Sequence, residues 1–195
     1  MQIDKELQFY LSIVQEHYVF EDDPIFVKAQ ASSKMQQVLN RKSDFNNDWL
    51  SCLDKIRTKP KRRIRDYGNS HNEPCYRCQL TLNENEAIHI FISFLCPVFG
   101  YYYCNYNEVS NSEFAVLIKD SSRPVNCISY SPYSLEQIEE REKITEIILE
   151  YFPGYQIFPM EYSKTVLRNV ELEGLIYPRI ELFQLLFSLY MDMLL

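Results

Sequence analysis

The chain has 195 residues, of which 46% are hydrophobic and 24% are charged, and its formal net charge is −7. This length is sufficient for a single domain that buries its own hydrophobic core. Glycine occurs four times and histidine three times. The sequence therefore excludes the glycine-rich loops of nucleotide-binding enzymes, the nucleophile elbow of ordinary α/β-hydrolases and the histidine-rich metalloenzymes.

The charge is distributed unevenly along the chain. Residues 1–65 carry 12 Lys/Arg and 9 Asp/Glu, a net charge of +3, whereas residues 66–195 carry 8 Lys/Arg and 18 Asp/Glu, a net charge of −10. An acidic surface repels nucleic acids and membrane phosphates and attracts basic proteins. It also keeps a protein soluble without any partner, which is the simpler interpretation.

The sequence predicts a cytoplasmic protein that does not bind membranes. Residues 1–10 have no basic segment followed by an apolar run, so no signal peptide is expected. The longest apolar stretch, residues 180–195, is short for a membrane span and contains Glu181 and Asp192. In this compartment the six cysteines are expected to be reduced.

The first part of the chain, about residues 1–58, predicts three helices. Asp4 and Asp44 each precede apolar residues at helical spacing, so both are expected to be N-caps. Pro24 follows two acidic residues and is expected to begin the second helix. Residues 59–74 are expected to form a loop. The loop begins with a basic run of five cations: Lys59, Lys61, Arg62, Arg63 and Arg65.

From about residue 75 to 130 the apolar pattern changes to a period of two, which is typical of strands. Residues 78–82 and 88–94 predict a hairpin around a turn at 83–86. Further strands are predicted at 101–106, 114–118 and 125–130. Because the connections are short, the expected arrangement is an antiparallel meander of four to five strands.

Residues 131–195 predict a C-terminal helical part. Ser134 and Gln137 form a capping-box pattern before a helix that runs to about Phe152. Residues 155–177 are expected to be irregular. A last helix is predicted from about Pro178, and it is apolar on almost every side, which favours a place in the core over a docking surface.

These elements together predict an α+β fold in a single domain spanning residues 1–195. N-terminal helices and C-terminal helices are expected to flank one face of the central antiparallel sheet.

No motif in the sequence predicts catalysis, a metal site or a cofactor. Cys75 and Cys78 form one Cys-x-x-Cys pair, but zinc would need two more ligands and no second pair occurs. His71 lies near Cys75, although neighbours in sequence rarely form a catalytic dyad. The basic run could grip nucleic acid or pair with acidic groups of the same chain; because the rest of the chain is acidic, nucleic acid is not the expected partner.

Tyrosine, with 15 residues, is the most suggestive feature of the composition. In the strand predicted at 101–106, tyrosines fall on both faces. One face can pack under the helices, and the other must be either covered or exposed. Exposed tyrosines beside acidic residues are typical of protein-binding surfaces; the alternative is an edge of the core. The predicted partner-binding residues are Tyr102, Tyr106, Glu108, Glu113, Glu139 and Glu142.

Two C-terminal segments resemble small cytoplasmic immunity proteins of bacterial polymorphic toxin systems. They are Tyr151-Phe-Pro-Gly-Tyr-Gln-Ile-Phe-Pro159, which follows a charged helix, and Glu181-Leu-Phe-Gln-Leu-Leu-Phe-Ser188. The resemblance implies a protein that binds a cognate toxin and blocks it, and it identifies no individual binding residue. The acidic half of the chain would suit a basic toxin.

Three functional hypotheses follow from the sequence. The first is a non-enzymatic inhibitor that neutralises a toxin, possessing no cofactor and acting by direct binding. The second is a structural or adaptor subunit that docks through the apolar C-terminal helix. The third is an enzyme without a recognisable motif, for which Cys75, Cys78 and His71 are the candidate residues. The sequence does not specify an oligomeric state.

Overall fold

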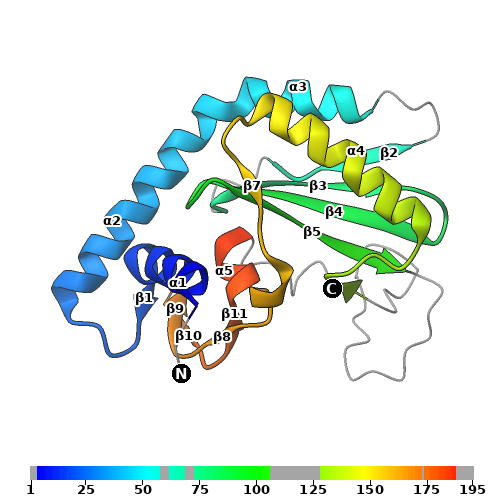
Figure 1. The fold of residues 1–195 in the computed structure, drawn as a ribbon. Coiled ribbons are helices and arrows are strands. Elements are labelled where there is room, and N and C mark those ends of the chain that lie inside the picture. The colour runs from blue at the N-terminus through cyan, green and yellow to red at the C-terminus, as the bar shows by residue number, and fades with distance from the viewer. Residues whose placement is uncertain (1–3, 58–61, 69–72, 106–127, 173, 188–195) are drawn as a thin grey trace.

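The computed structural model describes residues 4–57, 62–68, 73–105, 128–172 and 174–187. It has the predicted α+β class, with helices first, a meander sheet in the middle and helices again near the C-terminal end (Figure 1). None of the helices in these ranges is long and apolar enough to cross a membrane.

The central sheet is built from neighbouring strands in the order β2-β3-β4-β5-β6, all antiparallel. A further short strand, β7, pairs parallel to the start of β5. The bounds are β2 (Arg63–Asp66), β3 (Cys75–Thr81), β4 (Glu86–Ser93), β5 (Val98–Asn105), β6 (Ile128–Ser129) and β7 (Gln156–Ile157).

The predicted hairpin is confirmed, with Cys78 opposite Ile90 and the turn at residues 82–85. Two strand predictions need correction. Residues 63–66 are strand rather than loop, because they pair along β3. β5 begins at Val98 rather than Tyr101, because its pairing with β4 extends to Phe99. The strand predicted at 114–118 lies outside the described residues.

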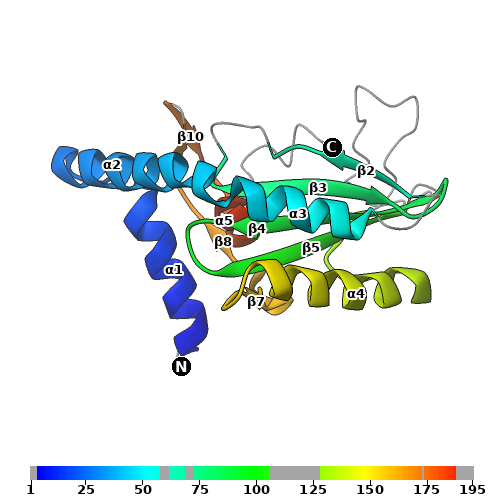
Figure 2. The same cartoon turned by 90° about the horizontal axis from the view of Figure 1, so that it is seen from above.

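Helical layers cover both faces of this sheet (Figures 1 and 2). Above it in Figure 1 lie α3 (Asn46–Ile56) and α4 (Leu135–Tyr151), which contribute to one hydrophobic core. Below it lie α1 (Lys5–His17) and α5 (Leu182–Phe187), which contribute to a second core. The C-terminal part thus supplies one helix to each face, which refines the arrangement expected from sequence.

The two cores explain why β4 is buried from Ala87 to Ser93. Alternate side chains of a strand point to opposite faces. We call the core on the side of α3 and α4 the upper core, and it contains Phe99, Tyr101 and Tyr103. The core on the side of α1 and α5 is the lower core, and it contains Tyr102. A strand with apolar partners on both sides carries a continuous apolar run.

The N-terminal helices begin largely as predicted. Asp4 Oδ1 accepts a hydrogen bond from the Glu6 amide at 2.9 Å and caps α1. α2 (Ile25–Arg41) begins directly after Pro24. Asp44 is not an N-cap: it lies within the 3-10 turn η1 (Lys42–Phe45), which joins α2 to α3. Because the chain continues through this turn, the Asn46 amide bonds back to the Ser43 carbonyl and needs no side-chain cap.

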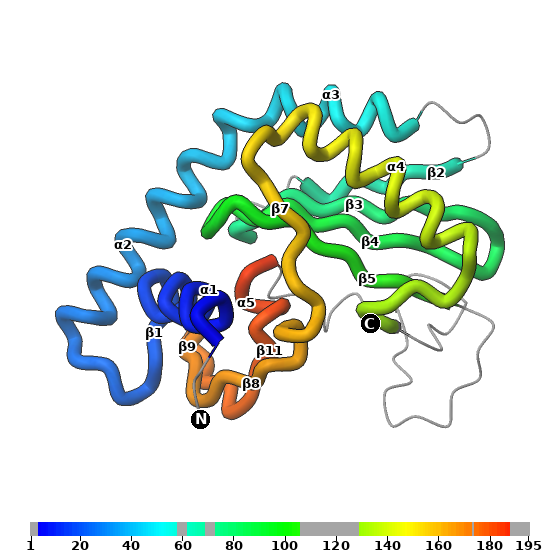
Figure 3. Tube along the Cα trace, viewed as in Figure 1, coloured from blue at the N-terminus to red at the C-terminus, as the bar shows by residue number. Residues whose placement is uncertain are grey.

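The sequence predicted that residues 155–177 are irregular. In the structure they contain several strands of two or three residues. β1 (Val19–Phe20), β9 (Val170–Leu172) and β10 (Leu175–Tyr177) form one small sheet. β8 (Val166–Leu167) pairs with β11 (Ile180–Glu181), and η2 (Met160–Tyr162) precedes them. Strands this short show no recognisable alternation. Figure 3 follows the chain from α4 past β7 to these strands below the sheet.

Candidate functional site

The outer side of α4 is an acidic surface. Six glutamates and two basic residues give this helix a net charge of −4. Its solvent-facing side also carries Glu136 and Lys143. Six residues on this side form what we call the α4 ridge: Leu135, Glu139, Glu142, Glu146, Leu149 and Glu150. These positions recur at intervals of three and four residues, so they share one face of the helix.

Residues at the N-terminus and on the opposite side of α4 fix the orientation of the helix and therefore of the ridge. The Gln137 amide donates to Ser134 Oγ at 3.2 Å, which confirms Ser134 as the N-cap; the reciprocal bond expected from the Ser134 amide comes instead from its neighbour Tyr133. Gln137 Oε1 accepts from the Tyr133 amide at 2.7 Å. Ile144 and Ile148 are buried in the upper core. Because the helix is held by this inner face, the ridge faces solvent.

Glu139 and Glu142, two of the predicted partner-binding residues, are therefore well exposed, with side-chain exposures of 70% and 66%. The sequence prediction overlooked the two leucines of the ridge. Leu135 is 77% exposed and Leu149 is 43% exposed. Their helical positions opposite the buried isoleucines could have revealed this exposure.

Tyr102 does not belong to any exposed surface, contrary to the prediction. Its exposure is 1%, and its ring stacks on His89 with centroids 4.4 Å apart. The prediction was wrong because both faces of β5 are covered, so a tyrosine on either face is buried. Tyr106, Glu108 and Glu113 lie outside the described residues.

Arg62 of the basic run is engaged within the chain. Its Nη2 lies 3.4 Å from Glu136 Oε1, and its Nη1 contacts Glu140. Glu140 lies on the inner side of α4 and is buried. This contact links the segment before β2 to α4 and leaves the ridge glutamates outside it. It is the intramolecular pairing considered as an alternative to nucleic-acid binding.

The described cysteines have the character of buried apolar residues. Cys52, Cys75, Cys78, Cys96 and Cys104 are all free and buried. Cys75 belongs to the lower core and Cys78 to the upper core, so the sheet separates the two thiols. Burial raises the pKa of Cys75 and Cys78 well above the ordinary value. Both thiols therefore remain protonated, which does not suit a nucleophile or a redox pair. His71 lies outside the described residues.

His89 is a buried titratable group on the lower face of the sheet. Burial, with a smaller effect from Arg77, lowers its pKa to about 3. The ordinary histidine pKa is about 6.5. Below about pH 6.5 the imidazole of His89 therefore binds a proton in the unfolded chain but stays neutral in the native state. The contribution of neutral His89 to the free energy of unfolding is therefore complete above about pH 6.5 and is lost as the pH falls towards 3.

We expect the free energy of unfolding to fall by about 2 kcal/mol between pH 7.5 and pH 5 through His89 alone. Urea denaturation at both pH values measures this loss. The variant His89→Phe keeps a planar ring against Tyr102 and should lose about 2 kcal/mol less than the wild type over the same range. Equal losses in His89→Phe and the wild type would contradict the assignment to His89.

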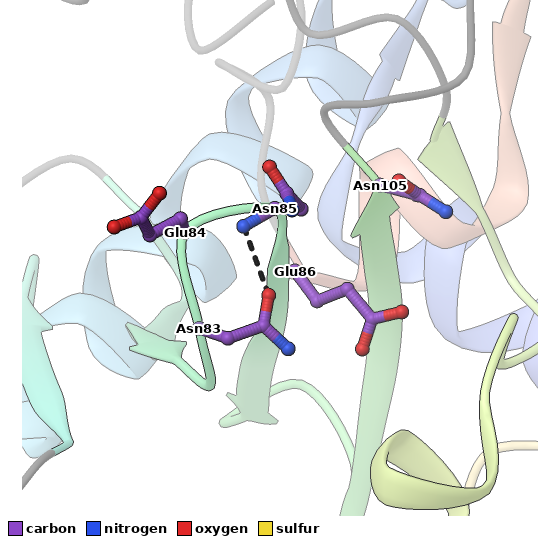
Figure 4. Close-up of a pocket in the computed structure, with 5 residues that line it drawn as sticks. All are labelled: Asn83, Glu84, Asn85, Glu86 and Asn105. Atoms are coloured by element: carbon purple, nitrogen blue, oxygen red, sulfur yellow. Dashed lines mark hydrogen bonds between the residues drawn. The ribbon is translucent and has the colours of Figure 1, made fainter.

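A polar pocket of about 350 Å³ lies at the β3–β4 turn (Figure 4). Its lining residues are Asn83, Glu84, Asn85, Glu86 and Asn105. Figure 4 shows Glu84 pointing away from Glu86, so the two carboxylates do not converge. Asn83 Oδ1 accepts from the Asn85 amide at 2.9 Å, and Glu86 Oε2 accepts from Ser134 Oγ at 2.9 Å. These contacts stabilise the turn and the start of α4.

Within the described ranges, no group of three or more His, Cys, Asp or Glu residues is placed to hold a metal ion. The α4 ridge combines exposed glutamates with exposed leucines, whereas other exposed apolar side chains, Ile25 and Phe26, lie at the start of α2. No family model matches the chain, and no match was found among curated proteins or solved structures.

Proposed function

We propose that this protein is a non-enzymatic inhibitor that binds another protein, and that the α4 ridge contacts a basic partner. The observation that carries the proposal is the pattern of the ridge: exposed glutamates with an exposed leucine near each end, opposite the buried face of the helix. The resemblance of residues 151–159 and 181–188 to immunity proteins supports a bacterial toxin as the partner.

The ridge has the chemistry of a protein interface. Carboxylates attract a basic partner over long distances and accelerate association. Apolar side chains that become buried on contact supply affinity. Leu135 and Leu149 are 14 residues apart, which corresponds to about 21 Å along a helix. A surface of this length fits a partner domain rather than a small molecule.

The two other hypotheses have less support from the described residues. An adaptor that docks through α5 would have to expose Leu182, Phe183 and Leu186, which are all buried within this chain. An enzyme that uses Cys75 and Cys78 would need at least one accessible thiolate, whereas both thiols are buried and protonated.

The proposal is tested by reversing the charge of the ridge. The triple variant Glu139→Lys, Glu142→Lys and Glu146→Lys should bind the captured basic partner at least about 100-fold more weakly, because attractive contacts become repulsive. The affinity is measured by calorimetry after capture of the partner from the source cell with tagged wild-type protein. Co-expression supplies the second readout: the wild type should neutralise the partner's toxicity, and the triple variant should not.

A matched control carries the same change in net charge elsewhere. Glu21→Lys, Asp22→Lys and Glu161→Lys alter exposed acidic residues away from α4. This control should weaken binding by less than about threefold at physiological salt, where charges separated by more than about 8 Å are screened. Equal weakening by both triple variants would exclude the ridge as the contact surface. Neutralisation by the ridge variant would likewise exclude the ridge as the contact surface, whereas failure of the wild type to retain any basic protein would exclude the inhibitor proposal.

A further inference from the structure

A small pocket lies where α2 leads through η1 into α3. Its volume is about 210 Å³. Arg41 and Phe45 contribute from the α2–η1 segment, Phe94, Leu95 and Cys96 from the β4–β5 connection, and Tyr155 from the chain that follows α4. Elements from three distant parts of the sequence therefore form one concave site.

Several of the side chains that line this pocket are apolar or aromatic. The rings of Phe45 and Phe94 stack with centroids 5.4 Å apart and an interplanar angle of 30°. Cys96 is buried, and burial raises the pKa of its thiol to about 12, so the thiol is uncharged. Walls of this kind favour an apolar body such as an aromatic ring or a branched aliphatic group.

Two of the lining residues, Arg41 and Tyr155, carry hydrogen-bond donors on their side chains. Arg41 carries a permanent positive charge, and none of the described carboxylates lies within 4 Å of its guanidinium in an ion pair. Burial raises the pKa of Tyr155 to about 12, so its hydroxyl keeps its proton. Arg41 is exposed at the rim of the pocket. A guanidinium and a phenol beside aromatic rings match an anionic acceptor, and the guanidinium fork fits a carboxylate especially well.

We propose that this pocket binds a carboxylate attached to an apolar body of about the size of a phenylalanine side chain. The apolar body lies between Phe45 and Tyr155, and the carboxylate pairs with Arg41. The small volume excludes a drug-sized ligand, since such sites usually measure about 300–1,000 Å³. The carboxylate comes either from a free arylalkanoic acid or from the C-terminal residue of a polypeptide. This inference does not depend on the proposed inhibitor function.

The test compares acids with their uncharged amides. The probes are 3-phenylpropionate, 3-phenylpropionamide, the peptide Gly-Gly-Phe with a free carboxylate, and the same peptide with a C-terminal amide. Binding to the full-length protein is followed by shifts of backbone amide resonances in ¹H–¹⁵N spectra. At least one acid should shift the resonances of Phe45, Leu95, Cys96 and Tyr155 in a saturable manner. The matching amide should bind about tenfold or more weakly, because it lacks the charge-assisted contact.

Variants test whether Arg41 causes the difference in affinity between the acid and the amide. Arg41→Gln should weaken binding of the acid by about tenfold or more and should remove the preference for acid over amide. Arg57→Gln is the matched control, because Arg57 lies on α3 and pairs with Asp54 at 2.8 Å. It should leave both affinities unchanged. Tighter binding of the peptide acid would identify a polypeptide C-terminus as the ligand, and tighter binding of 3-phenylpropionate would identify a free acid. No saturable shift with either acid, equal affinity for acid and amide, or full affinity in Arg41→Gln would each overturn the proposal.

Discussion

Replacing Phe183 with alanine is expected to reduce the free energy of unfolding by about 3–5 kcal/mol, as is usual when a buried phenylalanine is truncated. Phe183 is buried in the lower core, and its ring lies 4.5 Å from that of Phe187 and 5.0 Å from that of Tyr130. Truncation leaves a cavity that these rings cannot fill without moving. Urea or guanidinium denaturation at pH 7.5 measures the change.

Gly100 provides an internal check on this packing. A Cβ at this position would lie 2.8 Å from Phe183 Cε2 and 3.2 Å from Phe187 Cε2. Gly100→Ala alone should therefore destabilise the protein by about 1–3 kcal/mol through overpacking. In the Phe183→Ala background the new methyl group enters the cavity, so the double variant should be more stable than the sum of the single effects predicts.

Leu149→Ala is the control for apolar truncation at an exposed site, and its effect should stay within about 0.5 kcal/mol. If Phe183→Ala unfolded at the wild-type midpoint but abolished an assembly, α5 would be a docking element and the adaptor hypothesis would regain support. Additive effects of Gly100→Ala and Phe183→Ala would contradict the close approach of α5 to the sheet.

Removing the carboxylate of Glu73 is the second substitution with a large expected effect. Glu73 is buried, and its Oε2 lies 3.1 Å from Arg77 Nε. Lys42 Nζ is also buried and donates to the Glu73 carbonyl at 3.4 Å. Burial lowers the pKa of Lys42, whereas the Glu73 charge acts in the opposite direction. Glu73→Gln leaves the two cations without this compensating charge, so we expect a loss of about 3–5 kcal/mol.

A double-mutant cycle measures the interaction energy between Glu73 and Arg77. Arg77→Met should also be strongly destabilising, whereas Glu73→Gln combined with Arg77→Met should lose less than the two single effects together, because neither member of this pair then stays buried without the other. Burial also means that the loss in Glu73→Gln should persist in 1 M NaCl, since buried pairs are screened less than surface pairs.

Glu16→Gln is the matched surface control. Glu16 Oε1 lies 2.6 Å from Lys34 Nζ, with both side chains partly exposed. Its removal should cost less than about 1 kcal/mol, and this cost should shrink in high salt. A loss of similar size in Glu73→Gln and Glu16→Gln would show that the Glu73–Arg77 contact has no special role in stability.

Local sequence patterns determined most of the secondary structure of this protein. The Asp4 cap, the Pro24 start and the Ser134–Gln137 cap act within one helical turn, so their effect depends on few other residues. The alternation in residues 78–94 specified a hairpin because its two strands are adjacent in the chain. The same reasoning placed Glu139 and Glu142 on the charged side of a helix, where they are exposed.

Tertiary structure decided the features that depend on contacts between distant segments. Tyr102 is buried because helices cover both faces of the sheet, and no pattern within residues 101–106 records the second covering layer. The short strands at 166–181 exist through their pairing partners, since two or three residues carry too little alternation to specify a strand. The pocket at Arg41 requires three segments that meet only in the folded chain. Local propensities act over a few residues, whereas burial and strand pairing are decided by which surfaces meet when the whole chain folds.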